Sequence, residues 1–221
     1  MATGTDHMAM NTVIHNALRR DLARLDAVLA GPLPPERRAA VCAFVPWLVR
    51  TVHHHHVGED EGMWPRVVAK RPDAAELAAV NGAEHEAMVV ASDRMVAAAA
   101  AYGADGSEAN REALRGAVGE LASVTLPHLE HEERDSVPVV VATLDNADWK
   151  YLEKNYYRKG LSMKDASTSI MWMADDADAA GAAALHSQVP GPLMWFLGVT
   201  SGRSYDRDAA LRWGSLAGRR A

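Results

Sequence analysis

The chain has 221 residues, 48% of them hydrophobic, and 29 acidic against 23 basic residues give a formal net charge of −6. The length fits one domain with an extension or two small domains, and the dispersed basic residues lack the charge pattern of a nucleic-acid binder. The single cysteine, Cys42, excludes an intramolecular disulfide and any site built from several thiolates, so a reducing, cytoplasmic setting is expected.

Frequent alanine and only two phenylalanines favour helices over strands, and the predicted class is all-α. The first ten residues have neither the basic nor the apolar region of a signal peptide. No apolar stretch approaches the roughly 20 residues that a membrane-spanning helix needs. Neither a membrane nor a nucleic acid is therefore expected as a partner.

Four long helices are predicted in chain order, each with apolar residues at alternating steps of three and four. They span about residues 8–29, about 36–63 and about 73–102, and the fourth begins at about residue 108. Beyond about residue 146, glycine and proline punctuate three to five shorter helices. Each long helix carries polar side chains on its apolar stripe: His15 on the first, His55 and Glu59 on the second, His85 on the third, and His128 and Glu132 on the fourth.

The second and fourth helices carry an internal repeat. His55 and Glu59 are followed by Pro65, and His128 and Glu132 by Pro138, so both copies read H-x-x-x-E with a proline six residues after the glutamate. Four residues turn a helix by about 400° and rise about 6 Å, which brings each histidine and glutamate to one side.

Polar side chains that face a bundle core are costly to bury unless they are paired or bind a metal. Imidazoles and carboxylates without thiolates suit first-row metals such as iron, and helix bundles build dinuclear sites from inward side chains of all four helices. The pattern therefore predicts a metal site. Taken singly, a core histidine such as His15 or His85 is more often a hydrogen-bonded packing residue, and an H-x-x-x-E pair is as often an ordinary surface pair.

The run from His53 to His56 cannot face the core as a whole, because four successive helical residues point in four directions. His55 lies on the apolar stripe, and His56 is the next candidate for a metal ligand. His53, His54 and His131 are expected to surround the site or to face solvent.

These segments together resemble the hemerythrin-like HHE cation-binding family over about residues 7–140. The resemblance is carried by residues 15–20 (HNALRR), 55–65 (HHVGEDEGMWP), 84–86 (EHE) and 128–133 (HLEHEE). It implies an up-down-up-down four-helix bundle over residues 7–142 and a C-terminal helical extension over residues 145–221 that packs on the bundle. It also implies two iron ions joined by an oxo or hydroxo bridge, with Glu59 and Glu132 as bridging carboxylates and with terminal histidine ligands at positions 15, 55, 85 and 128.

Two features depart from the oxygen-carrying hemerythrins. Asn81 stands where those proteins have a second histidine on the third helix, and His128 and Glu132 are four rather than five residues apart. One iron therefore lacks a histidine. The alternatives for that place are an open position, a water molecule, His56 or a tyrosine of the extension (Tyr151, Tyr156 or Tyr157). Carboxylates beside the ligands, namely Glu61, Glu86, Glu130 and Glu133, are candidates for orienting the imidazoles.

An open position on iron permits redox chemistry with small molecules. The leading hypothesis is a di-iron oxidoreductase that reacts with hydrogen peroxide, dioxygen or nitric oxide. A second hypothesis is an iron or oxygen sensor or storage protein without turnover. The third is an oxygenase whose extension covers the site and forms a pocket for an organic substrate.

Overall fold

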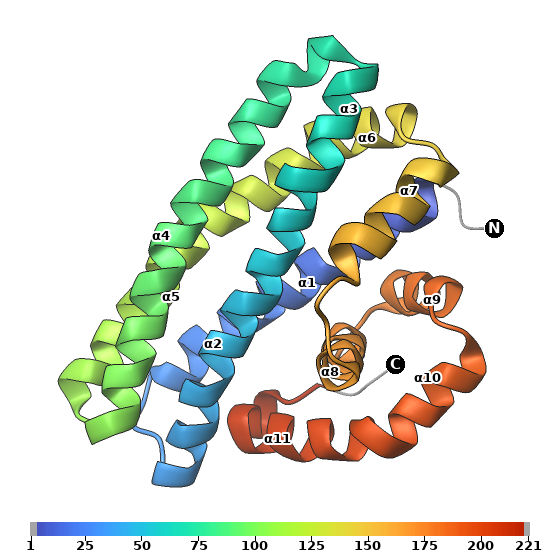
Figure 1. The fold of residues 1–221 in the computed structure, drawn as a ribbon. Coiled ribbons are helices and arrows are strands. Elements are labelled where there is room, and N and C mark those ends of the chain that lie inside the picture. The colour runs from blue at the N-terminus through green and yellow to red at the C-terminus, as the bar shows by residue number, and fades with distance from the viewer. Residues whose placement is uncertain (1–3, 219–221) are drawn as a thin grey trace.

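Residues 4–218 are described by the computed structural model, and within them every regular element is a helix (Figure 1). The four longest helices are α1 (Gly4–Leu29), α2 (Pro35–Val57), α4 (Ala75–Asp105) and α5 (Glu108–His131). Helix α4 packs against both α2 and α5, and α5 also packs against α1. The predicted all-helical class is confirmed.

Local signals explain where these helices begin and end. Pro35 occupies the start of α2, where a missing N–H is tolerated. The hydroxyl of Ser107 caps α5 by accepting a hydrogen bond from the backbone N–H of Asn110. Between α4 and α5, Gly106 adopts a φ of 66°, a left-handed conformation that favours glycine and ends α4. The predicted second and third helix starts therefore lie within two residues of the observed ones.

The second and fourth predicted helices do not continue as regular α-helices, which corrects the sequence prediction. A π-helical turn, η1 (Gly58–Met63), follows α2 and leads into α3 (Trp64–Lys70). Likewise η3 (Glu132–Ser136) follows α5 and leads into α6 (Val137–Thr143). The N–H of Trp64 bonds to the carbonyl of Glu59, five residues earlier, and that of Val137 to the carbonyl of Glu132.

The two prolines of the repeat explain both π-turns. Pro65 and Pro138 have no N–H to donate, and their rings crowd the preceding turn, so the helix widens just before them. Widened turns of this kind occur frequently at functional sites. The repeat thus specifies a backbone conformation in addition to two polar side chains, and it places the glutamate of each H-x-x-x-E pair in a π-turn.

The extension contains five α-helices within the described residues, in agreement with the predicted three to five. The elements after α6 are α7 (Asn146–Leu152), η4 (Glu153–Tyr157), α8 (Met163–Ala174), α9 (Ala179–Gln188), α10 (Gly191–Leu197), η5 (Gly198–Gly202), α11 (Arg203–Trp213) and η6 (Gly214–Leu216); a further short turn, η2 (Pro72–Ala74), precedes α4. In Figure 1 these C-terminal helices, orange to red, lie beside α1 and α2.

The extension is fixed to the bundle by buried contacts. Trp172 and Trp213 are at most 1% exposed and belong to the same hydrophobic core as the long helices. The indole N–H of Trp172 donates to the carboxylate of Asp21 on α1 at 2.8 Å, and the guanidinium of Arg24 donates to Asp175 at 2.7 Å. A search of the described helices for one long and apolar enough to cross a bilayer finds none.

Candidate metal centre

All seven side chains predicted as metal ligands come together between the long helices. None is more than 8% exposed. They are His15 from α1, His55 and His56 from α2, Glu59 from η1, His85 from α4, His128 from α5 and Glu132 from η3.

Each of the two glutamates lies between imidazoles from two helices. Glu59 places Oε1 3.2 Å from Nε2 of His55 and Oε2 3.6 Å from Nε2 of His85. Glu132 places Oε2 3.2 Å from Nε2 of His15 and 3.6 Å from Nε2 of His128. The two halves of the sequence repeat therefore form equivalent halves of one centre.

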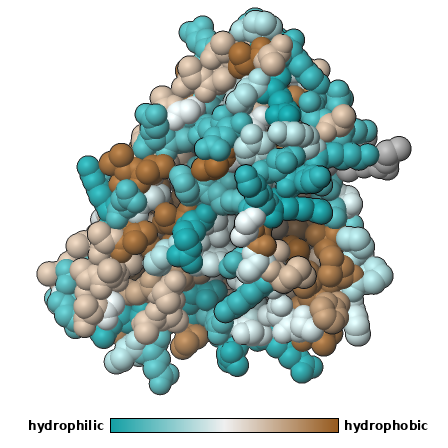
Figure 2. Space-filling view, in the orientation of Figure 1, coloured by the Kyte–Doolittle hydropathy of each residue, from teal (hydrophilic) through white to brown (hydrophobic). Residues whose placement is uncertain are grey.

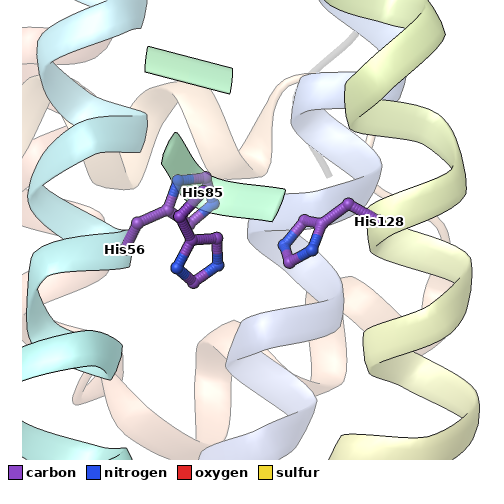
Figure 3. Close-up of side chains that lie close together, drawn as sticks. All are labelled: His56, His85 and His128. Carbon is purple, nitrogen blue, oxygen red and sulfur yellow. The ribbon is translucent and has the colours of Figure 1, made fainter. Parts of the chain in front are cut away.

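His56 belongs to this centre as well. Its ring stacks on that of His85, with centroids 4.1 Å apart and planes 10° apart, and the ring of His128 meets it edge-on. Figure 3 shows the three imidazoles converging in the space between the helices. Donor atoms of His56, His85 and His128 lie within 4.8 Å of one another, as do those of His55, His56 and Glu59. Two ligands about 2.1 Å from one ion are at most about 4.2 Å apart, so both groups are close to coordinating spacing.

Every one of these seven side chains has a buried polar atom without a hydrogen-bond partner in the described structure. The atoms are Nε2 of the five histidines and Oε2 of both glutamates. A buried polar atom left unpaired costs about 1–3 kcal/mol, and native structures contain few. Seven directed at one space form a cluster that could hold a metal, and a bound cation would satisfy them together.

The opposite ring nitrogens of three of these histidines are held by carboxylates. Nδ1 of His15 lies 2.9 Å from Glu133, and Nδ1 of His85 lies 2.8 Å from Asp60. Nδ1 of His128 lies 2.8 Å from Glu84. A carboxylate that accepts the Nδ1 proton leaves the lone pair on Nε2, which is the tautomer a metal ligand needs.

Of the four carboxylates predicted to orient imidazoles, Glu133 does so, and a bidentate ion pair with Arg19 holds it in place. Glu61, Glu86 and Glu130 do not take this role, because no hydrogen bond of the described residues joins any of them to a ligand imidazole. The residues one or two positions earlier in the chain, Asp60 and Glu84, take the role for His85 and His128. A shift of one or two residues along a helix turns a side chain by about 100° or 200°. Hydrophobic periodicity locates the buried face of a helix, but it does not say which of several neighbouring acidic residues outside that face reaches an imidazole.

The remaining predicted histidines surround the centre, as expected. His53 is exposed, and Nε2 of His54 lies 3.1 Å from the carbonyl of Tyr157. Nδ1 of His131 shares the carboxylate of Glu84 with His128. The side chain of His7 lies outside the described residues.

Asn11 also belongs to this cluster, although the sequence alone did not single it out. It is 5% exposed, and its side-chain N–H₂ donates to Oε1 of Glu132 at 2.8 Å. Its position four residues before His15, on the same helix face, was the available signal. Asn81, at the place of the absent histidine, is fully buried and donates to Ser136 instead.

Burial and neighbouring charges shift the pKa values of the clustered side chains in different directions. Burial, with the Glu132 and Asp60 carboxylates, raises the pKa of Glu59 well above its usual range. Burial also opposes ionisation of Glu132, but the neighbouring positive charge of His15 outweighs it and holds the pKa of Glu132 low. Burial likewise opposes the charge on His15, yet Glu132 and Glu133 raise the pKa of His15 to about 9. Burial first and then the neighbouring imidazoles lower the pKa of His55 to about 3 and depress that of His56.

Tyr157, one of the three tyrosines considered as reaching the site, is the one whose ring lies beside a predicted ligand. Its ring centroid is 6.4 Å from that of His55, and burial together with Glu59 and Glu132 raises the pKa of the phenol. Gly58 makes this approach possible, since a Cβ there would lie 2.4 Å from the Tyr157 ring. Tyr156 packs in the same way on Gly62.

An all-helical chain whose long helices surround seven unpartnered histidine and carboxylate donors defines a cation-binding helical protein. The family model of the hemerythrin HHE cation-binding domain matches residues 12–142, more than half of the chain, and the chain belongs to this family. No curated protein and no solved structure matches the chain.

Proposed function

We propose that this protein holds two iron ions, joined by an oxo or hydroxo bridge, and that it is an oxidoreductase whose centre reacts with hydrogen peroxide, dioxygen or nitric oxide. The observation that carries the proposal is the set of seven buried donor atoms without partners, five imidazole nitrogens and two carboxylate oxygens. Their number exceeds the six that one octahedral ion accepts, and carboxylates in such bundles commonly serve two ions. The absence of thiolates favours iron over softer metals.

We assign the donors to two sets. His56, His85 and His128 form one compact set, and His15 with His55, whose ring centroids are 5.8 Å apart, form the other; the rings of His55 and His56, 5.5 Å apart, adjoin across the two sets. Each carboxylate contacts one imidazole of either set, as a bridging ligand would. His56 thus takes the place that the absent histidine leaves, and the ion at the second set has fewer protein ligands. An incompletely ligated iron supplies a position for a small oxidant and a site for electron transfer.

The chain's own residues prepare this position. Glu84, Asp60 and Glu133 fix the imidazole tautomers, and Asn11 holds one oxygen of Glu132. A cavity of about 170 Å³, lined by apolar side chains such as Leu18, Val52 and Met88, reaches the centre from the side of the first set, at His56 and Thr125. It is large enough for a diatomic molecule or peroxide and too small for most organic substrates.

The same proposal includes the chain organisation implied by the resemblance. The connections between α1 and α2 and between α4 and α5 are only a few residues long, which favours antiparallel neighbours and an up-down-up-down bundle. We assign the centre to a domain of residues 7–142 and treat residues 145–221 as the packed extension.

Metal analysis of protein produced in iron-replete medium tests the proposal. We expect close to two irons per chain and near-ultraviolet absorption from an oxo bridge. Glu59→Ala and Glu132→Ala should each lose dinuclear loading, whereas the control His53→Ala, an exposed neighbour in α2, should retain it. Equal loss from the control, or less than a trace of transition metal in the unaltered protein, would overturn the proposal.

Peroxide-decay kinetics then separate turnover from sensing. Many equivalents of hydrogen peroxide consumed per di-iron centre support the oxidoreductase. A single stoichiometric oxidation, with no further consumption, supports the sensor or storage protein and overturns the catalytic part of the proposal.

A further inference from the structure

A second and larger cavity separates the bundle from the extension. It has a volume of about 610 Å³ and is lined by α1 and α2 on one side and by η4, α8 and the end of α9 on the other. Its inner end is formed by His55 and Glu59 of the metal centre. The volume lies within the roughly 300–1,000 Å³ of pockets that enclose drug-sized ligands. In Figure 2 hydrophobic side chains gather over the C-terminal helices on the right, beside a hollow in the surface.

The walls of this cavity are mostly apolar. Ile14 and Trp47 face it from the bundle, and Ile170 and Met173 from α8. Trp47 is held by an edge-to-face contact with Trp172, whose ring centroid is 5.7 Å away. Apolar surface around such a cavity favours a ligand with a hydrocarbon body.

The polar groups at the cavity include a free amide donor and two cations without an ion-pair partner among the described residues. The buried side-chain nitrogen of Gln188 has no hydrogen-bond partner within the described chain. Arg50 and Lys159 also line the cavity, and no ion pair of the described residues involves either of them. Two acidic wall residues are already engaged, since Glu153 lies 3.8 Å from Arg158 and Asp165 accepts a hydrogen bond from Ser162, and the third, Glu59, belongs to the candidate metal centre.

We propose that this cavity binds an apolar carboxylate beside the metal centre, with its hydrocarbon body between α2 and α8 and its carboxylate toward Arg50, Lys159 and Gln188. A guanidinium and an amide N–H₂ are suitable donors for a carboxylate. Arg50, His55 and Glu59 line the same cavity, and Arg50 precedes His55 by five residues, about 7.5 Å along the helix axis. A ligand whose carboxylate meets Arg50 would extend through this shared cavity toward His55 and Glu59. The claim that this ligand is a substrate of the metal centre rests on the proposed function. The claim that the cavity binds it does not.

The test measures binding of decanoate and of its uncharged counterpart, 1-decanol, by calorimetry to metal-free full-length protein. We expect one decanoate per chain and binding at least tenfold weaker for 1-decanol. Arg50→Ala should weaken decanoate at least tenfold and leave 1-decanol unchanged, because a charge-assisted hydrogen bond contributes more than a neutral one. The control Arg94→Ala removes an exposed arginine of α4 that pairs with Glu120 and should change neither affinity.

A second variant fills the cavity. Ala166→Trp on α8 should abolish binding of both ligands, and the melting temperature of this variant reports whether it folds. Arg50 is exposed, so Arg50→Ala should fold and remains informative if Ala166→Trp does not fold. Equal affinity for the two ligands, or no effect of Arg50→Ala, would refute the carboxylate specificity. No binding of either would refute the site.

Iron-loaded protein gives the last readout. Decanoate should perturb the iron absorption spectrum, and the Arg50→Ala protein should need at least tenfold more decanoate for the same change. Binding without any spectral change would show that the ligand does not lie beside the metal centre, and it would overturn the proposed position of the ligand. A protein that binds decanoate when metal-free but never loads iron would instead overturn the proposed function alone.

Discussion

Gly58 lies where the π-turn meets the extension, and replacing it with alanine should have opposite effects in two backgrounds. Its φ of −61° is ordinary for a helix, so the backbone gives no reason to avoid alanine there. Alanine should in fact stabilise a helical position by about 0.5–1 kcal/mol relative to glycine. The added Cβ, however, would lie 2.4 Å and 2.8 Å from two carbons of the Tyr157 ring.

Carbon atoms in contact are normally about 3.5–4.0 Å apart, so the ring must move by about 1 Å or more. Overpacking of this kind costs about 1–3 kcal/mol. Gly58→Ala should therefore lower the free energy of unfolding by about 0.5–2 kcal/mol in the natural protein. With Tyr157→Ala already present, the same substitution should raise it by up to about 1 kcal/mol.

Urea denaturation of the four proteins of this double-mutant cycle measures the reversal. Gly116→Ala in α5 is the matched control, because a Cβ there meets nothing within 4 Å, and it should stabilise both backgrounds equally. If Gly58→Ala stabilises the natural protein as much as Gly116→Ala does, Tyr157 does not pack against the π-turn and the assignment of this contact is refuted.

Three further predictions follow from the contacts of the centre and the bundle. Glu84→Ala removes the hydrogen-bond acceptor of His128 and His131 and should weaken metal affinity about 10–100-fold, measured in competition with a chelator. The control Glu86→Ala, at an exposed neighbour, should leave metal affinity unchanged. Equal effects of the two substitutions would contradict the orienting role of Glu84. Asp21→Ala removes a fully buried carboxylate and should lower the free energy of unfolding, measured by urea denaturation, by about 3–5 kcal/mol. Asp26→Ala, at an exposed carboxylate that pairs with Arg115, should lower it by less than about 1 kcal/mol. Similar losses from both would argue against a stabilising role of the buried contacts of Asp21. Because the pKa of His15 is about 9 in the metal-free protein, its imidazole carries a proton at pH 7 that a metal must displace. Metal loading at pH 7 should therefore release this proton, measured by calorimetry in buffers of different ionisation enthalpy, and affinity should rise with pH up to about 9; a pH-independent affinity would exclude this.

The sequence alone was enough to locate the centre, because its donors follow the helical period. His15, His85 and the two H-x-x-x-E pairs lie on apolar stripes, and side chains on such stripes must meet in the core. The choice of His56 from four successive histidines also required only the angle between helical residues.

Contacts between helices could not be read in the same way. The π-turns arise from the two prolines, but their effect on the aim of Glu59 and Glu132 depends on the packed helices around them. The orienting carboxylates were placed one or two residues too late, because several exposed acidic residues fit the local pattern equally well.

Periodicity is a local property, so the sequence by itself determined the helices, the inward donors and the family they indicate. The position of the extension is a non-local property, and only the tertiary structure decided it. Trp172 docks on Asp21, 151 residues earlier, and Tyr157 lies over Gly58. Those contacts form the cavity beside His55. The spacing of residues along the chain does not determine how segments so far apart in the sequence are placed relative to one another.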